Sequence, residues 1–411
     1  MKTKKNRFLT QKDLLTKTST FYILLILLFS FSLPQMAKAA YMPDGGGGKK
    51  PKFDVGGALR FNYRYMTWKD ETYAKIANAQ GGEFLLDTFR FDINGSYKGL
   101  KLSTEYRFYA GYNMLHHGYV EYDVNKNNRF QLGISQVPFN IQPYASHNWF
   151  FSIGYYVGLE DNYDAGLKYI HYHGPWTIKA AFYKNSGGNY TGHSLASSRY
   201  SYDVVPARKS LAGMTSNNRE VNQFDLKIAY TIKHGKLGST KLSFSGQYGQ
   251  LYNDKLNEFG NHNAWALNLN GYYGRFNVQL GAIRMAQNPK TLPGIPNDRV
   301  VMGAYDFPYE VAAKGNIYLV GLAYKVPVKW GPITSLNFYN DFSMYDKDKK
   351  SFYNTFHNVT GCAISAGKVY TYIDFANGKN DPWLGQFTGL GPGVKNAKWK
   401  LRFNVNIGYY F

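Results

Sequence analysis

The sequence predicts an all-β protein, a transmembrane up-and-down antiparallel β-barrel of about sixteen strands. Three observations lead to this prediction: the last segment alternates strictly between apolar and polar residues, similar segments precede it, and the connections between them alternate between short and long. Successive side chains of a strand point to opposite faces of the sheet, so alternation indicates one apolar and one polar face. Within hydrocarbon the sheet must close on itself, because a free edge would leave backbone polar groups unsatisfied.

The last segment, residues 399–411, is the clearest strand. Its apolar face consists of Trp399, Leu401, Phe403, Val405, Ile407, Tyr409 and Phe411. Its polar face consists of Lys400, Arg402, Asn404, Asn406 and Gly408. At about 3.3 Å per residue, the run is long enough to cross a bilayer when tilted. We therefore expect Val405 to face lipid and Asn404 to face the lumen, where a lysine would be tolerated.

The amino terminus predicts export. Residues 1–39 combine a lysine-rich start, an apolar run too short to span as a helix, and the small-residue triplet Ala37-Lys38-Ala39, which is typical of a cleaved signal peptide. The alternative is an uncleaved anchor. Residues 40–52 contain four consecutive glycines and predict a flexible periplasmic tail. Residues 53–411 then form the barrel, and the expected location is the outer membrane of a Gram-negative cell.

The composition agrees with a membrane barrel. The 37 tyrosines raise the aromatic fraction to 18%, and tyrosine favours the boundary between hydrocarbon and water. A tyrosine-rich soluble β protein is the alternative. The formal net charge is +21, and an exported basic chain rarely meets nucleic acid, so the expected partners are outer-membrane lipid, lipopolysaccharide and small anions. Cys362 is the single cysteine, which excludes an intramolecular disulfide and a cysteine-based metal cluster.

Alternating segments begin at Phe53 and recur along the chain. They occupy residues 53–65, 89–97, 101–108, 120–124, 130–135, 165–169, 176–182, 224–233, 241–248, 265–273 and 276–282, with weaker ones at 318–326, 336–342, 357–366 and 368–377. With the final segment they make sixteen strands, and no long segment carries helical spacing.

The connections alternate in length. Short turns are expected at residues 98–99, 125–128, 173–175, 234–239, 274–275, 327–331 and 366–367. Longer links are expected at residues 66–82, 137–162, 185–220, 251–263, 286–315, 345–356 and 378–397. Only residues 110–113 break the pattern. A barrel with both ends in the periplasm predicts this asymmetry, with short periplasmic turns and long extracellular loops. Sixteen strands leave a lumen too wide for wall side chains alone to fill.

The polar faces predict what lines the lumen. Their basic members are Arg60, Arg64, Arg90, Lys101, Arg107, Lys168, Lys179, Lys227, Lys233, Lys241, Lys400 and Arg402. Their acidic members are Asp54, Asp92, Glu105, Glu121, Asp123, Asp164 and Asp225. This excess of cations favours anions modestly, since wall charges set ion preference and arginine forks suit phosphate and carboxylate oxygens. The alternative is a set of internal ion pairs that only hold the barrel together.

Several segments resemble a known family. The run from Arg129 to Asn140 contains Gly-x-x-x-x-Pro-Phe and resembles the strand that enters the inward loop of the phosphate-selective porin family, the O and P type, in its Bacteroidetes form. Residues 338–343, 370–374 and 408–411 are similar to its later strands. The resemblance implies a sixteen-stranded homotrimeric porin that passes small hydrophilic solutes or anions. It also implies that Tyr409 and Phe411 belong to a terminal signal for the barrel-assembly machinery.

Residues 137–162 are expected to fold inward as the constriction. The residues singled out there are Pro138, Phe139, Tyr144, His147, Trp149, Glu160 and Asp161. A phosphate-selective pore needs cations at its narrowest point, yet this loop contains no lysine or arginine, which departs from the family pattern. Its many aromatic residues either pack against the wall or form a greasy slide for carbohydrate or another amphipathic solute.

Metal and catalytic chemistry are not predicted. His116 and His117 are adjacent in a strand and would point to opposite faces, so they do not form a metal site, and no cofactor is expected. No Ser-His-acid arrangement can be placed, so the chain is not expected to be an enzyme. The sequence therefore predicts an outer-membrane porin. The alternatives are a barrel hydrolase and a structural or adhesion barrel whose lumen is plugged.

Overall fold

The structure is a computed structural model, and it describes residues 51–69, 72–188, 190–194 and 196–411. The predicted signal peptide, residues 1–39, and nearly all of the predicted tail, residues 40–52, lie outside the described residues. The predicted barrel lies almost wholly within them.

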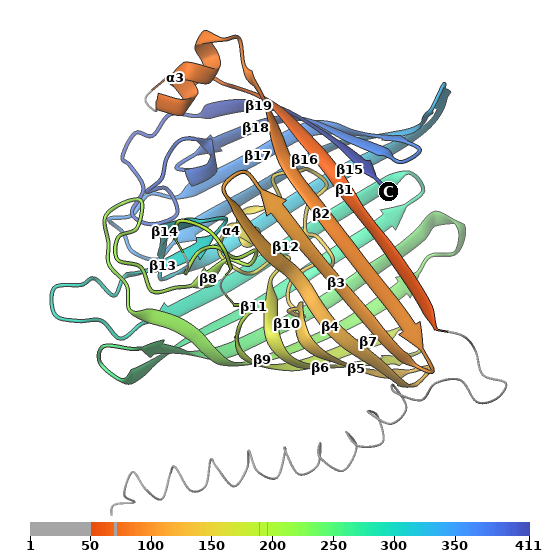
Figure 1. The fold of residues 1–411 in the computed structure, drawn as a ribbon, viewed down its shortest axis with the longest axis horizontal. Coiled ribbons are helices and arrows are strands. Elements are labelled where there is room, and N and C mark those ends of the chain that lie inside the picture. Colours follow the sequence, from red (N-terminus) through yellow and green to blue (C-terminus); the bar gives the residue numbers. More distant parts are fainter. Residues whose placement is uncertain (1–50, 70–71, 189, 195) are drawn as a thin grey trace, which may run out of the picture. The chain divides into compact units, whose positions relative to one another are not determined.

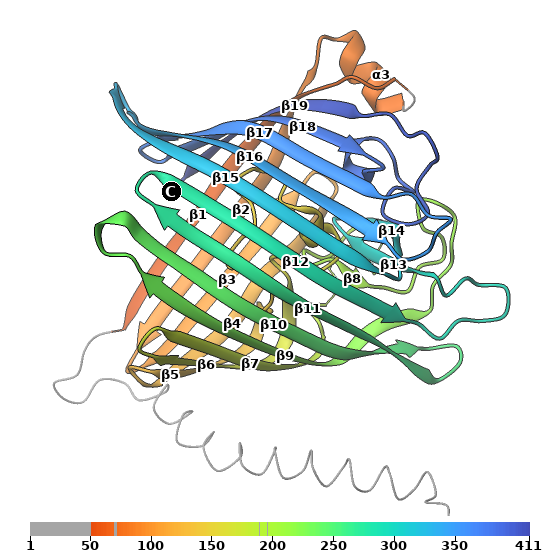
Figure 2. The ribbon, with the colours of Figure 1, turned by 180° about the vertical axis from the view of Figure 1, so that it is seen from behind.

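The described chain forms a closed antiparallel barrel of sixteen strands, which confirms the predicted fold class and strand number (Figures 1 and 2). The barrel strands are β1 (Lys52–Met66), β2 (Glu83–Tyr97), β3 (Leu100–Tyr109), β4 (Tyr112–Asn125), β5 (Asn128–Gln136), β6 (Tyr163–His173), β7 (Trp176–Ser186), β9 (Asn218–Lys233), β10 (Gly238–Asn253), β11 (Glu258–Tyr273), β12 (Phe276–Asn288), β15 (Lys314–Trp330), β16 (Ile333–Lys347), β17 (Thr355–Ala366), β18 (Val369–Lys379) and β19 (Lys400–Tyr410).

The first and last strands close the sheet. The β1–β19 ladder runs from the pair Ala58–Tyr410 to the pair Met66–Arg402. Beyond its end, Gly57 and Phe411 exchange backbone hydrogen bonds of 3.2 and 3.1 Å. Closure leaves the sheet without an edge, which is the condition for a β-structure to lie in hydrocarbon.

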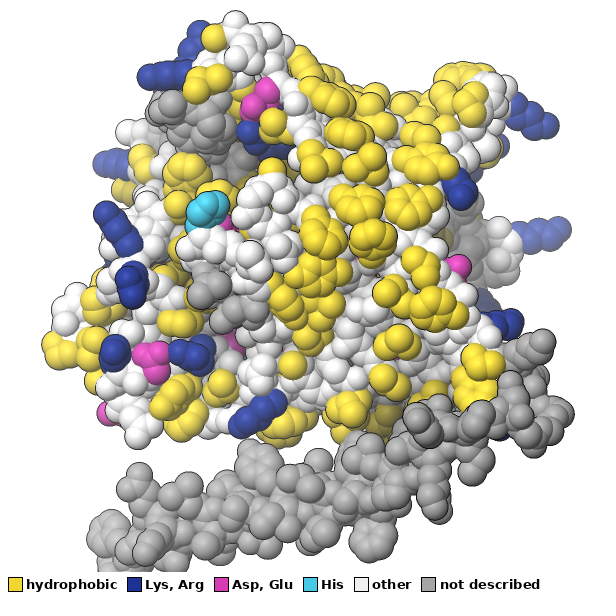
Figure 3. All heavy atoms as spheres, in the orientation of Figure 1, with side chains coloured by type: hydrophobic (Ala, Val, Ile, Leu, Met, Phe, Trp, Pro, Cys, Tyr) yellow, Lys and Arg dark blue, Asp and Glu magenta, His cyan; other side chains and the backbone are white. Residues whose placement is uncertain are grey.

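The outward face of the barrel is apolar. Large apolar side chains such as Leu267, Val320 and Phe375 are about half exposed, at 55%, 50% and 47%. Figure 3 shows apolar side chains across the middle of the visible face of the wall, with lysine and arginine toward both ends. None of the helices that the structure describes is long and apolar enough to cross a membrane. The outward band has the character of a lipid-facing surface.

The two ends of the barrel differ, as predicted. At the end where β1 begins and β19 ends, hereafter the short-turn end, strands are joined by tight connections such as residues 98–99 and 274–275. At the opposite end, hereafter the long-loop end, the main connections are L1 (67–82), L3 (137–162), L4 (187–217), L6 (289–313) and L8 (380–399). One predicted long link, residues 251–263, is wrong: β10 and β11 continue past their apolar alternation, and only residues 254–257 join them.

The loops carry further elements that the sequence pattern did not predict. Helix α3 (Thr72–Ala79) lies in L1, α4 (Ile153–Tyr156) in L3, and a short 3₁₀ turn, η2 (Pro382–Leu384), in L8. The strands β8 (Asp203–Val204), β13 (Arg299–Ala304) and β14 (Phe307–Ala312) come from L4 and L6 and form a separate three-stranded sheet.

This small sheet belongs to the main hydrophobic core. Met302 pairs with Val204, and both side chains are about 1% exposed. The core joins L3, L4, L6 and L8 to inward-facing residues of the wall such as Ile283 and Ile317. Burial of these apolar side chains by wall and loops together explains how a wide barrel acquires a packed interior.

The final strand corrects one expectation. Val405 lies on the outward-facing side, but Asn404 is fully buried and accepts a 2.8 Å hydrogen bond from Arg402. A lysine at position 404 would displace this packed contact, so the expected tolerance is wrong. Asn404 therefore faces a packed part of the interior.

Leu267→Lys tests the assignment of faces. Leu267 lies near the middle of β11 on the outward face, so a lysine there should lower the free energy of unfolding by about 2–4 kcal/mol. Leu267→Phe keeps an apolar side chain toward lipid and should stay within about 0.5 kcal/mol of the parent. Urea unfolding from lipid vesicles measures both. Equal stability of the two variants would show that the faces are assigned wrongly.

Candidate functional site

Loop L3 crosses the lumen, as the sequence predicts. It leaves β5, and its tip reaches β16, which lies on the opposite side of the ring of strands. There His147 Nδ1 lies 2.7 Å from Asp341, and the backbone N–H of His147 donates to the same carboxylate at 2.7 Å. On the opposite side of the imidazole ring, His147 Nε2 lies 2.6 Å from Asn277 Oδ1. The loop is therefore tied to β16 and β12 and narrows the lumen.

Three of the predicted lumen cations hold this loop at its base. Lys168 donates to the backbone oxygen of Gln136 at 2.7 Å. Lys179 donates to the side-chain oxygen of Gln142 at 2.7 Å, and Lys227 donates to the backbone oxygen of Asn140. Lys179 and Lys227 are direct cross-strand partners of β7 and β9. Like charges in that position repel, and the oxygens of the loop offset the repulsion.

The acidic residues of L3 are structural. The Glu160 carboxylate accepts from the backbone N–H of Ala145 at 2.8 Å and from the Ser152 hydroxyl at 2.5 Å. Asp161 accepts from Tyr200 at 2.6 Å. Burial raises the pKa of both carboxyl groups to about 7, against the partial opposition of these hydrogen bonds. Both side chains are buried, and neither lines the lumen cavity described next.

A cavity of about 560 Å³ lies inside the barrel. One side of it is basic: its arginines come from four neighbouring strands around the seam, β19, β1, β2 and β3. They are Arg60, Arg64, Arg90, Arg107 and Arg402. All five were predicted to face the lumen. Asp87 is the one carboxylate among the described residues that line this cavity.

Each arginine of β1 to β3 has a carboxylate partner. Arg60 lies 2.8 Å from Asp87, and Arg64 lies 2.5 Å from Glu83. Arg90 lies 3.2 Å from Glu105, which also accepts from Arg107. These ion pairs agree in part with the alternative given by the sequence, in which the lumen charges only hold the barrel together. They also fix the guanidinium groups, since a paired arginine has fewer rotamers available.

The other side of the cavity is aromatic, and four loops contribute to it. Its loop residues are Tyr144, Trp149, Phe150, Phe151, Tyr155 and Tyr156 from L3, Tyr200 and Tyr202 from L4, Tyr305 and Phe307 from L6, and Trp383 from L8. Phe151 and Tyr155 stack with ring centroids 4.1 Å apart. The two sides meet where the Arg107 guanidinium lies 4.7 Å from the Tyr200 ring and that of Arg402 lies 5.4 Å from the Trp149 ring.

The other predicted site residues lie elsewhere. Lys101 pairs with Glu121 at 2.9 Å and with Asp123 at 2.7 Å. Lys400 donates to the backbone oxygen of Gly385 at 2.6 Å. Lys233 and Lys241 are exposed near the short-turn end of β9 and β10.

The aromatic and proline residues of L3 divide between two roles. Pro138 and Phe139 are buried and pack at the base of the loop. Tyr144, His147 and Trp149 line the cavity. The loop therefore provides both wall packing and an aromatic lumen surface. At the chain terminus, Tyr409 and Phe411 are exposed, and their role in assembly stays a prediction.

The expectation for His116 and His117 is wrong. A β-bulge sets Glu105 opposite His117 but Tyr106 opposite Leu115, so His116 is an extra residue and both rings face inward. Their Nδ1 atoms lie 2.8 Å apart beside Glu105. Glu105 is already paired with Arg90 and Arg107, and two guanidinium groups oppose a further cation. The cluster is therefore a histidine pair beside a glutamate that two arginines already bind, and we assign no metal to it.

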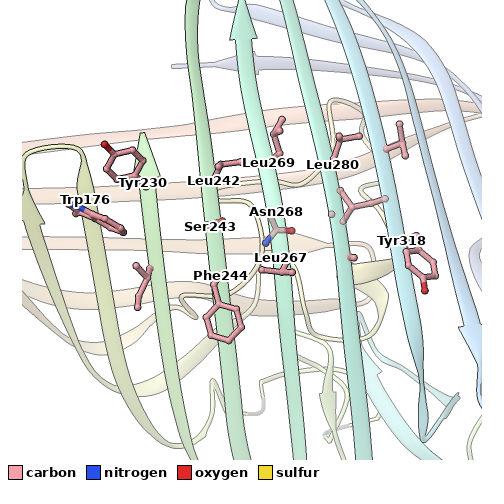
Figure 4. A pocket seen from close by; sticks show the side chains of 15 residues that line it. Trp176, Tyr230, Leu242, Ser243, Phe244, Leu267, Asn268, Leu269, Leu280 and Tyr318 are labelled. Carbon is pink, nitrogen blue, oxygen red and sulfur yellow. The ribbon is translucent and has the colours of Figure 1, made fainter. Parts of the chain in front are cut away.

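A second hollow lies on the outer wall and has a different character. It spans β7 to β15 with a volume of about 740 Å³, and Figure 4 shows its apolar lining. The largest side chains there are Trp176, Tyr230, Phe244, Leu267 and Tyr318. No lysine, arginine or carboxylate is among the described residues that line it. It lies on the apolar outward band and is separate from the lumen cavity.

Comparison with known proteins places the fold. Neither a protein-family model nor a curated protein matches the sequence. The outer membrane channel DcaP of Acinetobacter baumannii matches with a TM-score of 0.55 and 11% identity, over 90% of this chain and 100% of that one. The anion-selective porin from Comamonas acidovorans matches with a TM-score of 0.54 and 13% identity, over 88% and 100%.

A trimer form of OmpT, an outer membrane protein of Vibrio cholerae, matches with a TM-score of 0.51 and 12% identity, over 88% of this chain and 100% of that one. At such identities the likeness shows a common fold. The chain thus has the fold of Gram-negative outer-membrane β-barrels, and its apolar band agrees with that location.

The L3 tether should depend on pH. Burial opposes protonation of His147, but the hydrogen bond and charge of Asp341 outweigh burial, so the pKa of His147 lies above its ordinary value. The tether should therefore stabilise L3 fully below about pH 6.5 and weaken as the pH rises through the raised pKa. Hydrogen exchange of residues 145–150 measures this weakening.

Asp341→Asn is the control for this prediction. It removes the charge that raises the pKa of His147, so the exchange of residues 145–150 should be faster at low pH and depend less on pH. Asp341 also contributes to the raised pKa of Glu160, so the variant changes the titration of both His147 and Glu160, whereas the pKa of Asp161 is raised mainly by its own burial. Identical profiles for parent and variant would contradict the tether.

Proposed function

We propose that the protein is an outer-membrane porin, a water-filled diffusion channel for small hydrophilic solutes with a modest anion preference. The observation that carries the proposal is the lumen cavity, which five guanidinium groups and one carboxylate line among the described residues. Charges on a low-dielectric wall act on ions more strongly than the same charges in water. The Comamonas acidovorans structure with a similar fold is described as an anion-selective porin.

Phosphate selectivity is the finer form of this proposal. It rests on the resemblance of residues 129–140 to the O and P type porins. The structure weighs against a strong phosphate site, because the lysines at the base of L3 are engaged by loop oxygens and the arginines are paired with carboxylates. Block of chloride current by added phosphate distinguishes a selective pore from a general one.

The homotrimer is likewise a proposal. The resemblance implies it, and one structure with this fold is described as a trimer form. The apolar outward band would then contact both lipid and neighbouring copies. The mass of the detergent-solubilised protein, with bound detergent subtracted, distinguishes a trimer from a monomer.

A plugged structural barrel is the second candidate. The observation that favours it is the packing of L4, L6 and L8 into the long-loop half of the lumen, where Tyr202, Val301 and Leu390 are almost fully buried. A plugged barrel would insert into membranes without conducting. The presence or absence of current therefore separates the two candidates.

Conductance in a planar bilayer tests the porin proposal. Purified protein under a KCl gradient should give discrete conductance steps and a reversal potential on the anion side. Arg64→Gln removes a lumen cation and should lower the anion-to-cation permeability ratio roughly twofold or more. Lys126→Gln removes a cation from an exposed turn at the short-turn end and should change the ratio less. Absence of steps would contradict the porin, and a cation-side reversal would contradict its anion preference.

A further inference from the structure

We propose that the lumen cavity is a binding site for solutes that carry a carboxylate on a flat aromatic ring. The inference rests on the proposed channel function, and it specifies the class of solute that the same lumen binds best. It follows from the separation of the cavity into an arginine side and an aromatic side.

The arginine side supplies the recognition of the acid. A guanidinium carries five N–H donors in a planar fork, so a single carboxylate partner leaves donors for a second acceptor. Arg60 meets Asp87 through one Nη atom at 2.8 Å. Arg90 meets Glu105 and Asp92 through its two Nη atoms at 3.2 and 3.4 Å. The Nε–H group of each arginine has no hydrogen-bond partner among the described residues. Both residues also line the cavity. The donors are already fixed by their ion pairs, so a solute carboxylate that enters the cavity binds them without the entropic cost of ordering these side chains.

The aromatic side supplies the recognition of the ring. Tyr155 stacks on Phe151 and lies edge-on to Tyr202, with centroids 4.1 and 5.1 Å apart. Tyr202 is followed by Tyr305 at 5.9 Å, so the rings form a continuous surface. Tyr144 and Phe307 are each 44% exposed among the residues that line the cavity. Partly exposed rings beside a packed aromatic cluster offer faces and edges to a flat solute.

The size of the cavity suits such a solute. A buried cavity of about 150 Å³ is sufficient to hold benzene. The lumen cavity has a volume of about 560 Å³ and so has room for a ring, its acidic group and some water. The guanidinium groups of Arg107 and Arg402 lie over the rings of Tyr200 and Trp149, at 4.7 and 5.4 Å, so the basic and aromatic sides of the cavity are in direct contact.

The same features disfavour inorganic phosphate. The five arginines of the cavity are accompanied by Asp87, Glu83, Asp92 and Glu105, so the local excess of positive charge is small. A phosphate dianion needs a strong positive field to replace its hydration, and aromatic rings replace none of it. A monocarboxylate carries one negative charge, so it needs less positive charge to replace its hydration. An aromatic monocarboxylate is also stabilised by contact with the rings. Ring contact therefore decides which anion binds better.

The test is block of chloride current through the full-length protein in planar bilayers. The probes are benzoate, cyclohexanecarboxylate, acetate and inorganic phosphate, added at a fixed ionic strength. Benzoate should half-block at a concentration at least about tenfold below that of acetate. Its half-blocking concentration should also be about fivefold below that of cyclohexanecarboxylate, which has the same charge and a similar size but no π-face.

Variants locate the effect in the cavity. Tyr144→Leu and Phe307→Leu remove partly exposed cavity rings without emptying a packed core position, and each should reduce the benzoate-to-cyclohexanecarboxylate ratio toward one. Phe375→Leu removes a 47% exposed ring from the outward face of β18 and should leave the ratio unchanged. Because the readout is a ratio within each protein, a general change in conductance does not affect it.

The outcomes separate this inference from the channel proposal. If the protein gives no conductance steps, the proposed function fails and the inference fails with it. If it conducts but benzoate and cyclohexanecarboxylate block equally, or phosphate blocks at the lowest concentration, the channel stands and the inference is overturned. A benzoate preference that survives both cavity variants also overturns it, because binding then lies elsewhere.

Discussion

The structure depends on the requirement that every backbone N–H and C=O group within hydrocarbon must have a partner inside the protein. The chain meets this requirement by pairing β1 with β19, from the pair Ala58–Tyr410 to the pair Met66–Arg402. Closure at sixteen strands sets the diameter of the barrel, and a barrel of this size cannot be filled by wall side chains alone. The interior must then be occupied by loops, by water or by both. The candidate site is a consequence of how this chain divides that space.

The charges of the lumen divide into two groups with different consequences. On the side of β6, β7 and β9, Lys168, Lys179 and Lys227 bond to oxygens of L3 and hold its base. Around the β1–β19 seam, the arginines pair with carboxylates yet still line the cavity. The first group positions the loop that narrows the lumen. The second group gives the remaining space its basic side.

The sequence predicted the features that depend on local alternation. The sixteen strands, the closure of the first on the last and the inward course of L3 all follow from which residues alternate and how far apart the segments lie. The predicted arginines also lie where expected, because a strand of known phase fixes the face of each side chain. Thus Arg60, Arg64 and Arg402 could be placed in the lumen before any coordinates were known.

The features that depend on long-range packing could not be predicted in this way. Strand β8 is two residues long and exists only as a partner of β13, from a loop about a hundred residues away. A single bulged residue reversed the expected face of His116. The aromatic side of the cavity collects rings from four loops, and no spacing within one loop indicates that they meet. The aromatic residues of L3 were one signal, since they predicted either wall packing or a greasy slide, but the tyrosine-rich composition of the whole chain pointed to interfacial girdles rather than to the lumen.

The most direct measurement asks whether the lumen cavity lies on the path that ions take. Tyr144→Cys in a Cys362→Ala background places a thiol at the cavity, and Phe375→Cys in the same background places one on the outward face. A negatively charged thiol-reactive reagent should reduce the single-channel current of the first protein stepwise and leave that of the second unchanged. If complete labelling of Tyr144→Cys, verified by mass, leaves the current unaltered, the cavity is not the conduction path and the functional assignment of the lumen is wrong.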